Sequence, residues 1–149
     1  MTQDMLNTPT AEMPLLAAID LGSNSFHIVV AKVVQGELQP IDMLSEKVQL
    51  AAGLDDNRFL SEEAQERGLE CLRRFAQRIQ DIPPHSVSVV GTNALREACN
   101  SQDFIDKAEK ILGTDIEIIA GIEEARLIYL GVSHTLASDQ GQRLVVDIG

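Results

Sequence analysis

Two short strings in this 149-residue chain repeat the same order of residue types. Asp20 closes the apolar run "LLAAID" and precedes Leu and Gly, whereas Asp147 closes "RLVVD" and precedes Ile and Gly. If the two runs are neighbouring buried strands, the two carboxylates meet at one edge of a sheet. Carboxylates placed in this way commonly hold a divalent cation that bridges to phosphate. The alternative is a pair of unrelated strand-end turns, which the match between the strings makes less attractive.

The first string continues into "GSNS", a run of small and polar residues. Gly22 permits a tight turn and a close backbone approach. Ser23, Asn24 and Ser25 offer hydroxyls, an amide and consecutive N–H groups, which together can cradle phosphate oxygens. Taken alone, the stretch is better interpreted as an ordinary hairpin loop in which Asp caps its own turn.

Two adjacent glutamates, Glu123 and Glu124, follow Gly121 in the string "GIEEAR" and lie in the first turn of a predicted helix. Acidic residues stabilise helix N-termini, which is a sufficient structural explanation. The functional alternative is a general base that positions a water molecule. Because successive helical residues point about 100° apart, only one of the two can face a cleft. Arg126 is expected to be structural or to lie on the rim.

A third string, "GTNALREA", follows a predicted buried strand and opens a helix, whose N-terminus favours anions. Thr92 and Asn93 stand at this start, and Arg96 lies one turn in, from where it could reach a phosphate. A surface salt bridge is an equally good interpretation of Arg96 on spacing alone. The three histidines show no metal-ligand spacing, and His27 is expected to be packed within a strand.

The elements that must position these residues follow from periodicity and turn signals. Strands are predicted at 15–20, 26–34 and 38–50, joined by short turns as in an antiparallel meander, with Pro40 placing the third at a sheet edge. Ser61 is the predicted N-cap of a helix that ends before Pro83. The remaining predicted elements are a strand at 86–92, a helix at 93–113 broken near Asn100, a strand at 116–120, a helix at 121–136 and a strand at 143–149. This β-β-β-α-β-α-β-α-β order predicts an α/β fold, with a mixed sheet that carries helices on its faces.

Composition limits the classes of function. The formal net charge of -11 argues against general nucleic-acid binding, although local N–H groups and arginines can still hold an anion. No apolar run approaches the roughly 20 residues of a membrane helix. Two isolated cysteines, Cys71 and Cys99, suggest a reducing compartment. With 44% hydrophobic residues and 3% aromatic residues, an aliphatic core is expected. The first fourteen residues lack the basic region and the long apolar stretch of a signal peptide, so a cytoplasmic location is expected.

These strings, in this order, resemble the exopolyphosphatase/guanosine pentaphosphate phosphohydrolase (Ppx/GppA) family. The resemblance runs from about Leu15 to Gly149 and is collinear over six segments: "AAIDLGSNSFHIVVAKV", "KVQLAAGLD", "LSEEAQERGLECLRRFA", "VGTNALREA", "GIEEARLIYLGVSHT" and "LVVDIG". It implies a ribonuclease-H-like domain of the actin-like ATPase superfamily. Residues 1–14 would be a flexible leader, and residues 15–149 the first domain of a longer protein, truncated at the start of its second phosphate loop.

The resemblance also implies roles for individual residues. Glu124 matches the catalytic base of the family, with Glu123 as its supporting neighbour. Asp20 and Asp147 match the metal-associated aspartates, with Mg²⁺ as the implied cofactor and a monovalent cation such as K⁺ as a further candidate. The implied phosphate-binding residues are Gly22, Ser23, Asn24, Ser25, Thr92, Asn93, Arg96 and Gly149.

The activity implied by the resemblance is Mg²⁺-dependent hydrolysis of the terminal phosphoanhydride of inorganic polyphosphate, with release of orthophosphate. Guanosine pentaphosphate is the close alternative substrate. A non-hydrolytic actin-like module that binds a nucleotide or an alarmone is the alternative of another class. The full-length protein is expected to be a homodimer, and this fragment alone is expected to be inactive.

Overall fold

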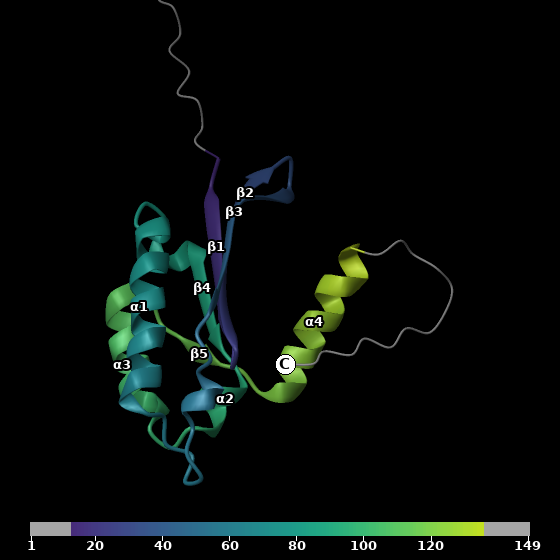
Figure 1. The fold of residues 1–149 in the computed structure, drawn as a ribbon. Helices are drawn as coiled ribbons and strands as arrows, with labels where there is room; N and C mark the ends of the chain where they lie inside the picture. Colours follow the sequence, from purple (N-terminus) through teal and green to yellow (C-terminus); the bar gives the residue numbers. More distant parts are fainter. Residues whose placement is uncertain (1–12, 136–149) are drawn as a thin grey trace, which may run out of the picture.

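A five-stranded mixed sheet forms the centre of the chain in the computed structural model, which describes residues 13–135 (Figure 1). The strand order is β3-β2-β1-β4-β5, with β1–β2 and β2–β3 antiparallel and β1–β4 and β4–β5 parallel. The strands are β1 (Leu15–Leu21), β2 (Ser25–Val34), β3 (Glu37–Lys47), β4 (Val87–Gly91) and β5 (Glu117–Ile118). The meander and the mixed sheet predicted from the sequence are therefore confirmed, whereas β5 is shorter than expected.

The turn between β2 and β3 is built from Gln35 and Gly36, both with positive φ, at 53° and 83°. A two-residue turn in which both residues have positive φ has the same twist as the two strands that it joins. Pro40 lies on β3 beside a register irregularity at Val30/Ala31, and β3 is the edge strand, as predicted. A proline without an N–H is tolerated at such an edge.

Helices follow the predicted order, with one division. The helical elements are η1 (Ala51–Gly53), α1 (Glu62–Ile79), η2 (Pro84–Ser86), α2 (Asn93–Glu97), α3 (Ser101–Leu112) and α4 (Gly121–Thr135). The Ser61 hydroxyl accepts a hydrogen bond from the N–H of Ala64 at 3.2 Å, so the predicted N-cap of α1 is confirmed. The break near Asn100 separates α2 from α3, and α3 ends at Gly113 with φ 70°. The predicted strand at 143–149 lies outside the described residues.

One face of the sheet is covered by α1 and α3, which lie side by side in Figure 1. Alternate residues of β1, namely Ala17, Ile19 and Leu21, are buried beneath them. The core is less purely aliphatic than expected, because Phe26, Phe75 and Phe104 are its largest fully buried side chains. The sequence has few aromatic residues, but their large apolar area places most of them at the centre.

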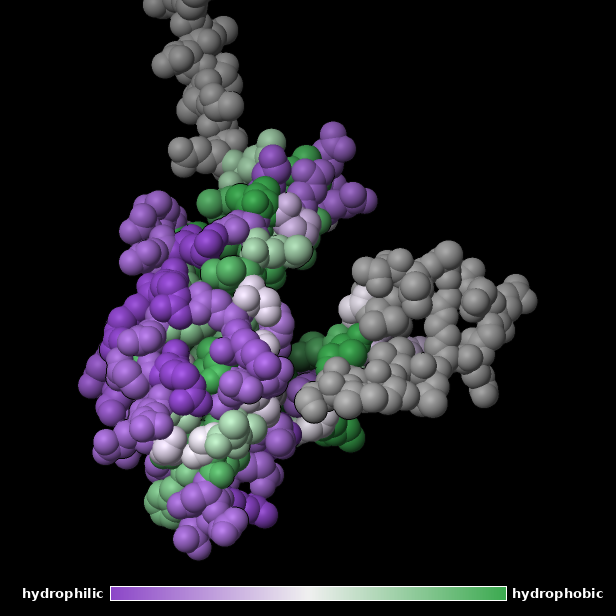
Figure 2. Space-filling view, viewed as in Figure 1, coloured by the Kyte–Doolittle hydropathy of each residue, from purple (hydrophilic) through white to green (hydrophobic). Residues whose placement is uncertain are grey.

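The opposite face of the sheet carries the other residues of β1, and α4 extends on that side of the sheet in Figure 1. An apolar hollow of about 330 Å³ lies there near the amino ends of β1 and β4, lined by residues that include Leu16, Ala18, Val29 and Leu38. Figure 2 shows hydrophobic surface at that end of the sheet and on α4, whereas the helices α1 and α3 present a hydrophilic face. Among residues 13–135, no helix is both long and apolar enough to span a bilayer.

Candidate active site

The predicted site residues come from three segments that follow β1, β4 and β5. These strands run parallel, so their carboxyl ends meet at one edge of the sheet, where α/β proteins usually bind ligands. The Thr92 N–H donates to the carbonyl of Leu21 at 3.4 Å, and the Ile119 N–H donates to the carbonyl of Gly91 at 3.1 Å. The sheet itself therefore assembles the site from parts that are distant in sequence.

The loop from Gly22 to Ser25, which we name the first loop, is a tight turn between β1 and β2. A Cβ atom on Gly22 would lie 2.7 Å from the backbone oxygen of Ser25, so only glycine fits this turn. The carbonyls of Ser23 and Asn24 accept hydrogen bonds from the N–H groups of Ala51 at 2.9 Å and Gln49 at 2.7 Å. Two carbonyls that would repel a phosphate are thus turned towards residues 49–51, which we name the strap.

The first loop is also joined to α2. The hydroxyl oxygen of Ser23 accepts a hydrogen bond from the N–H of Ala94 at 3.1 Å. Thr92, the residue before α2, is 5% exposed and makes no capping bond through its own side chain. The helix that Thr92 and Asn93 open has only five residues, because the predicted 93–113 helix is divided near Asn100, so its N-terminus carries a small dipole. Ser23 supplies the cap that the local sequence does not.

Asp20 lies inside β1, one residue before the strand ends at Leu21. It pairs with His27 and Val90 in the sheet register. The Oδ2 atom of Asp20 lies 3.9 Å from Nδ1 of His27, and the two side chains are 49% and 56% exposed. The expectation that His27 is packed is therefore wrong. Strand alternation puts both residues on the face that α1 and α3 do not cover.

The half-exposed carboxylate of Asp20 suits a magnesium ion. Mg²⁺ keeps several water ligands and is usually bound by one or two carboxylates together with phosphate oxygens. Within residues 13–135 there is no group of three potential ligands that would form a closed metal cage. Asp147, the second predicted ligand, and Gly149, the predicted start of a second phosphate loop, lie outside the described residues.

Arg96 is the most connected side chain of the site. Its Nη1 donates to the carbonyl of Ile119 at 2.6 Å, and its Nη2 donates to Oδ1 of Asn93 at 3.2 Å. The same Nη1 lies 3.8 Å from Oε2 of Glu124, and the two side chains are 28% and 27% exposed. The spacing of Arg96 left a salt bridge and a phosphate contact open, and the structure shows an ion pair directed into the site.

The two adjacent glutamates point in different directions, as the helical geometry requires. Glu123 accepts hydrogen bonds from Nε and Nη2 of Arg126 at 2.8 and 2.6 Å on the exposed side of α4. The hydrogen bonds from Arg126 lower the pKa of the Glu123 carboxyl. Glu123 is thus tied to the rim, and Glu124 is the one that lies beside Arg96.

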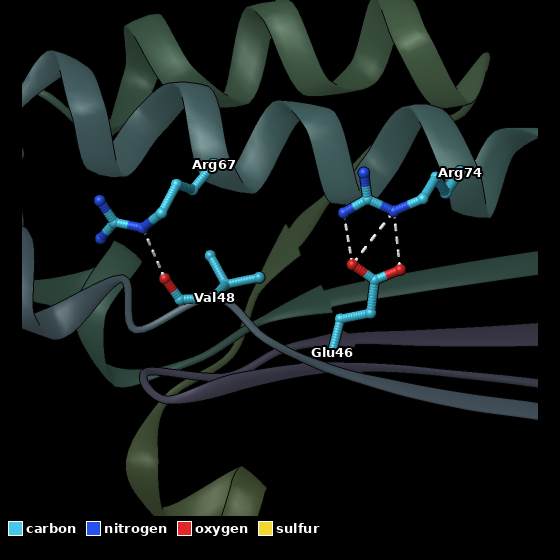
Figure 3. A network of polar contacts seen from close by, with 4 residues as sticks. All are labelled: Glu46, Val48, Arg67 and Arg74. Carbon is cyan, nitrogen blue, oxygen red and sulfur yellow. Dashed lines mark hydrogen bonds and ion pairs between the residues drawn. The ribbon is translucent and has the colours of Figure 1, made fainter.

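Sequence reasoning missed the contacts that hold the strap in place. Figure 3 shows Arg67 reaching from α1 to the carbonyl of Val48, at 3.1 Å from Nε, and a second bond joins its Nη2 to the carbonyl of Gln49 at 3.3 Å. Gln49 has a positive φ of 55°, which no glycine or asparagine signals in the sequence. Only the position of α1 over the sheet reveals that Arg67 supports the strap.

Two arginines of α1 join this helix to the edge strand β3. Nε of Arg74 donates to both carboxylate oxygens of Glu46 on β3, at 2.8 and 3.1 Å, and Arg78 pairs with Asp42 on the same strand (Figure 3 shows the Arg74 pair). The hydrogen bond from Arg74 lowers the pKa of Glu46. These pairs fasten the edge strand to the helix.

Comparisons with known proteins agree with this arrangement. The sequence model of the Ppx/GppA phosphatase family matches residues 29–149. An exopolyphosphatase from Cytophaga hutchinsonii is 31% identical, with a TM-score of 0.76, over 80% of this chain and 38% of that chain. A Ppx/GppA family member from Aquifex aeolicus is 26% identical, with a TM-score of 0.75, over 83% of this chain and 40% of that chain. This chain thus spans well under half the length of these solved relatives.

The strand order, the strand directions and the family match together support the fold predicted from the sequence. The antiparallel meander followed by parallel strands agrees with the mixed sheet that the family resemblance implied. The family model covers the strings that contain Arg96, Glu123 and Glu124, and it begins four residues after the first loop. The chain belongs to the Ppx/GppA phosphatase family.

Proposed function

We propose that the protein containing this chain is a magnesium-dependent exopolyphosphatase, which releases orthophosphate from the end of inorganic polyphosphate. The observation that carries the proposal is the half-buried pair of Arg96 and Glu124, 3.8 Å apart, at the edge of the sheet where the first loop begins. A cation and a carboxylate side by side suit a reaction in which one group holds a phosphate and the other handles a water. The similarity to an exopolyphosphatase from Cytophaga hutchinsonii supports this choice of substrate.

The proposed mechanism assigns each step to residues of this chain. The N–H groups and hydroxyls of the first loop, together with Thr92, Asn93 and Arg96, bind the oxygens of the terminal phosphate. Glu124 orients the attacking water and accepts its proton. Positioning and electrostatic stabilisation supply most of the catalysis in phosphoryl transfer.

The proposed metal site uses Asp20 and Asp147, while Gly149 would begin the second phosphate loop. Mg²⁺, when bound, supplies positive charge that offsets the charge developing on the phosphate oxygens. A monovalent cation such as K⁺ is proposed to accompany Mg²⁺. Because this chain spans only 38–40% of these two solved relatives, we propose that residues 1–149 alone have little activity. We also propose, from the family resemblance, that the full-length protein is a cytoplasmic homodimer.

Phosphate release by the full-length protein tests the proposal. The wild type should release orthophosphate from polyphosphate faster than from guanosine pentaphosphate, and chelation of Mg²⁺ should abolish both reactions. E124Q should lower kcat by about a hundredfold or more, in line with the contribution of a general base. E70Q, at an exposed position of α1, is the matched control and should retain the wild-type rate. A wild-type rate in E124Q would contradict the role of Glu124.

Two other results would redirect the proposal. Faster hydrolysis of guanosine pentaphosphate than of polyphosphate would identify the alternative substrate with the same site. Tight binding of ATP by a protein that leaves both substrates intact would overturn the enzyme assignment in favour of a non-hydrolytic nucleotide-binding module.

A further inference from the structure

The junction between β5 and α4 places Glu124, and it has little support of its own. β5 has two residues, so it contributes few bonds to the sheet ladder. The chain then turns into α4 within the next two residues, and Glu124 lies in the first turn of that helix. The position of the Glu124 carboxylate therefore depends on whatever fixes Ile119 and the start of α4.

Ile119 is fixed by the last residue of β4 and by a side chain of α2. Its N–H donates to the carbonyl of Gly91 at 3.1 Å, and its carbonyl accepts from Nη1 of Arg96 at 2.6 Å. Ile119 is buried, so a carbonyl left without a donor there would carry a desolvation cost. Arg96 is in this way a bridge from α2 to the last buried residue before α4.

The same guanidinium lies against the start of α4. A Cβ atom on Gly121 would lie 3.7 Å from Nη2 of Arg96, which shows how closely the side chain approaches the first residue of the helix. Nη1 reaches Glu124 at 3.8 Å, and Nη2 is anchored by Asn93 at 3.2 Å. The planar guanidinium group of arginine can contact these partners at the same time, whereas the ammonium group of lysine cannot.

We infer that Arg96 is a positioning residue for Glu124, which it places by holding the carbonyl of Ile119 at the β5–α4 junction as well as by the ion pair. The inference rests on the proposed function only for the role of Glu124. Beyond the proposed contact with phosphate, Arg96 would position Glu124 already in the substrate-free protein. An arginine that only grips phosphate would affect substrate binding and leave the empty site unchanged.

Hydrogen exchange in the substrate-free, full-length protein separates these two roles. The reporters are the Ile119 N–H, bonded to Gly91, and the Glu124 N–H, which donates to the carbonyl of Ala120 at 2.9 Å. In R96Q and R96K both amides should exchange about tenfold faster than in the wild type, the effect of losing one buried hydrogen bond. Amides in the middle of α1 should not change, which shows that both variants are folded.

R126Q is the matched control, because Arg126 also contacts the start of α4 but pairs with Glu123 on the exposed side of that helix. In R126Q, the exchange rates of the Ile119 and Glu124 amides should stay within twofold of those in the wild type. At saturating polyphosphate, R96K should lower kcat at least tenfold. Lysine keeps the positive charge but lacks the planar guanidinium that bonds the carbonyl of Ile119.

Unchanged exchange at both amides in R96Q and R96K would overturn the inference, whatever happens to the rate. A wild-type kcat in R96K at saturating substrate would overturn it as well. The wild type could hydrolyse neither polyphosphate nor guanosine pentaphosphate while the Arg96 variants still exchange both amides faster. That result would support the role of Arg96 at the β5–α4 junction and would contradict the proposed function.

Discussion

The hydroxyl oxygen of Ser23 accepts a hydrogen bond from the N–H of Ala94, a residue 71 positions further along the chain. The bond joins the turn after β1 to the helix after β4. It caps α2 at a place where Thr92 makes no capping bond through its side chain. A residue that sequence similarity assigns to phosphate binding therefore also holds two parts of the site together.

Replacement of Ser23 by alanine should weaken this connection. We expect S23A to lower the free energy of unfolding by about 1 kcal/mol, the usual contribution of one hydrogen bond, and to speed exchange of the Ala94 amide. Urea denaturation and amide exchange of the full-length protein measure the two effects. S88A, at an exposed position of β4, is the control and should change neither. An unaltered Ala94 amide in S23A would show that another acceptor caps α2.

Replacement of Gly22 by alanine should disrupt the first loop. The new Cβ would lie 2.7 Å from the backbone oxygen of Ser25, so the turn must change its path. We expect phosphate release to fall at least about tenfold, because shifts near 1 Å in positioned groups have large effects on rate. G131A is the matched control, since the position is exposed, a Cβ there meets none of the described atoms within 4 Å, and alanine favours the helix by about 0.5–1 kcal/mol. Full activity in G22A would contradict the role of this turn.

The pair of Glu46 and Arg74 should make stability depend on pH. Because Arg74 lowers the pKa of Glu46 below its ordinary value of 4.5, the stabilisation is complete above that value and is lost as the pH falls through the lowered pKa. E46Q should lose about 1 kcal/mol at pH 7, a typical value for a well-formed surface pair. The difference from the wild type should shrink as the pH falls below 4.5 towards 3.

Denaturant titrations at pH 7 and at pH 3.5 measure this change. E37Q, at the exposed first residue of the same strand, is the control and should match the wild type at both pH values. A constant difference between E46Q and the wild type across this range would mean that the packing of the side chain, rather than its charge, stabilises the edge strand.

The two cysteines should react with thiol reagents at very different rates. Burial, and next the charge of Glu46, raise the pKa of the Cys71 thiol to about 12, and this side chain is inaccessible, whereas Cys99 is exposed. At pH 8 iodoacetamide should label Cys99 within minutes and leave Cys71 unmodified until denaturant is added, because the thiolate is the reactive form. Peptide mass mapping distinguishes the sites. Fast labelling of native Cys71 would contradict the packing of α1 on the sheet.

Local pattern determined most of the secondary structure. Short apolar runs predicted β1 and β2, Ser61 before two glutamates predicted the start of α1, and the end of the predicted helix at Gly113 matches the end of α3. These features are set by residues close together in the chain, so the sequence carries them directly. The string "GIEEAR" likewise required that only one glutamate face the site, because that follows from helical geometry alone.

What the local pattern could not determine was which residues meet. The parallel pairing of β4 and β5 brings Glu124, rather than Glu123, beside Arg96. Arg67 supports the strap only because α1 packs across the sheet. His27 proved exposed beside Asp20 because α1 and α3 cover the other face of β1 and β2. Contacts of this kind depend on long-range packing, and only the tertiary structure decides them.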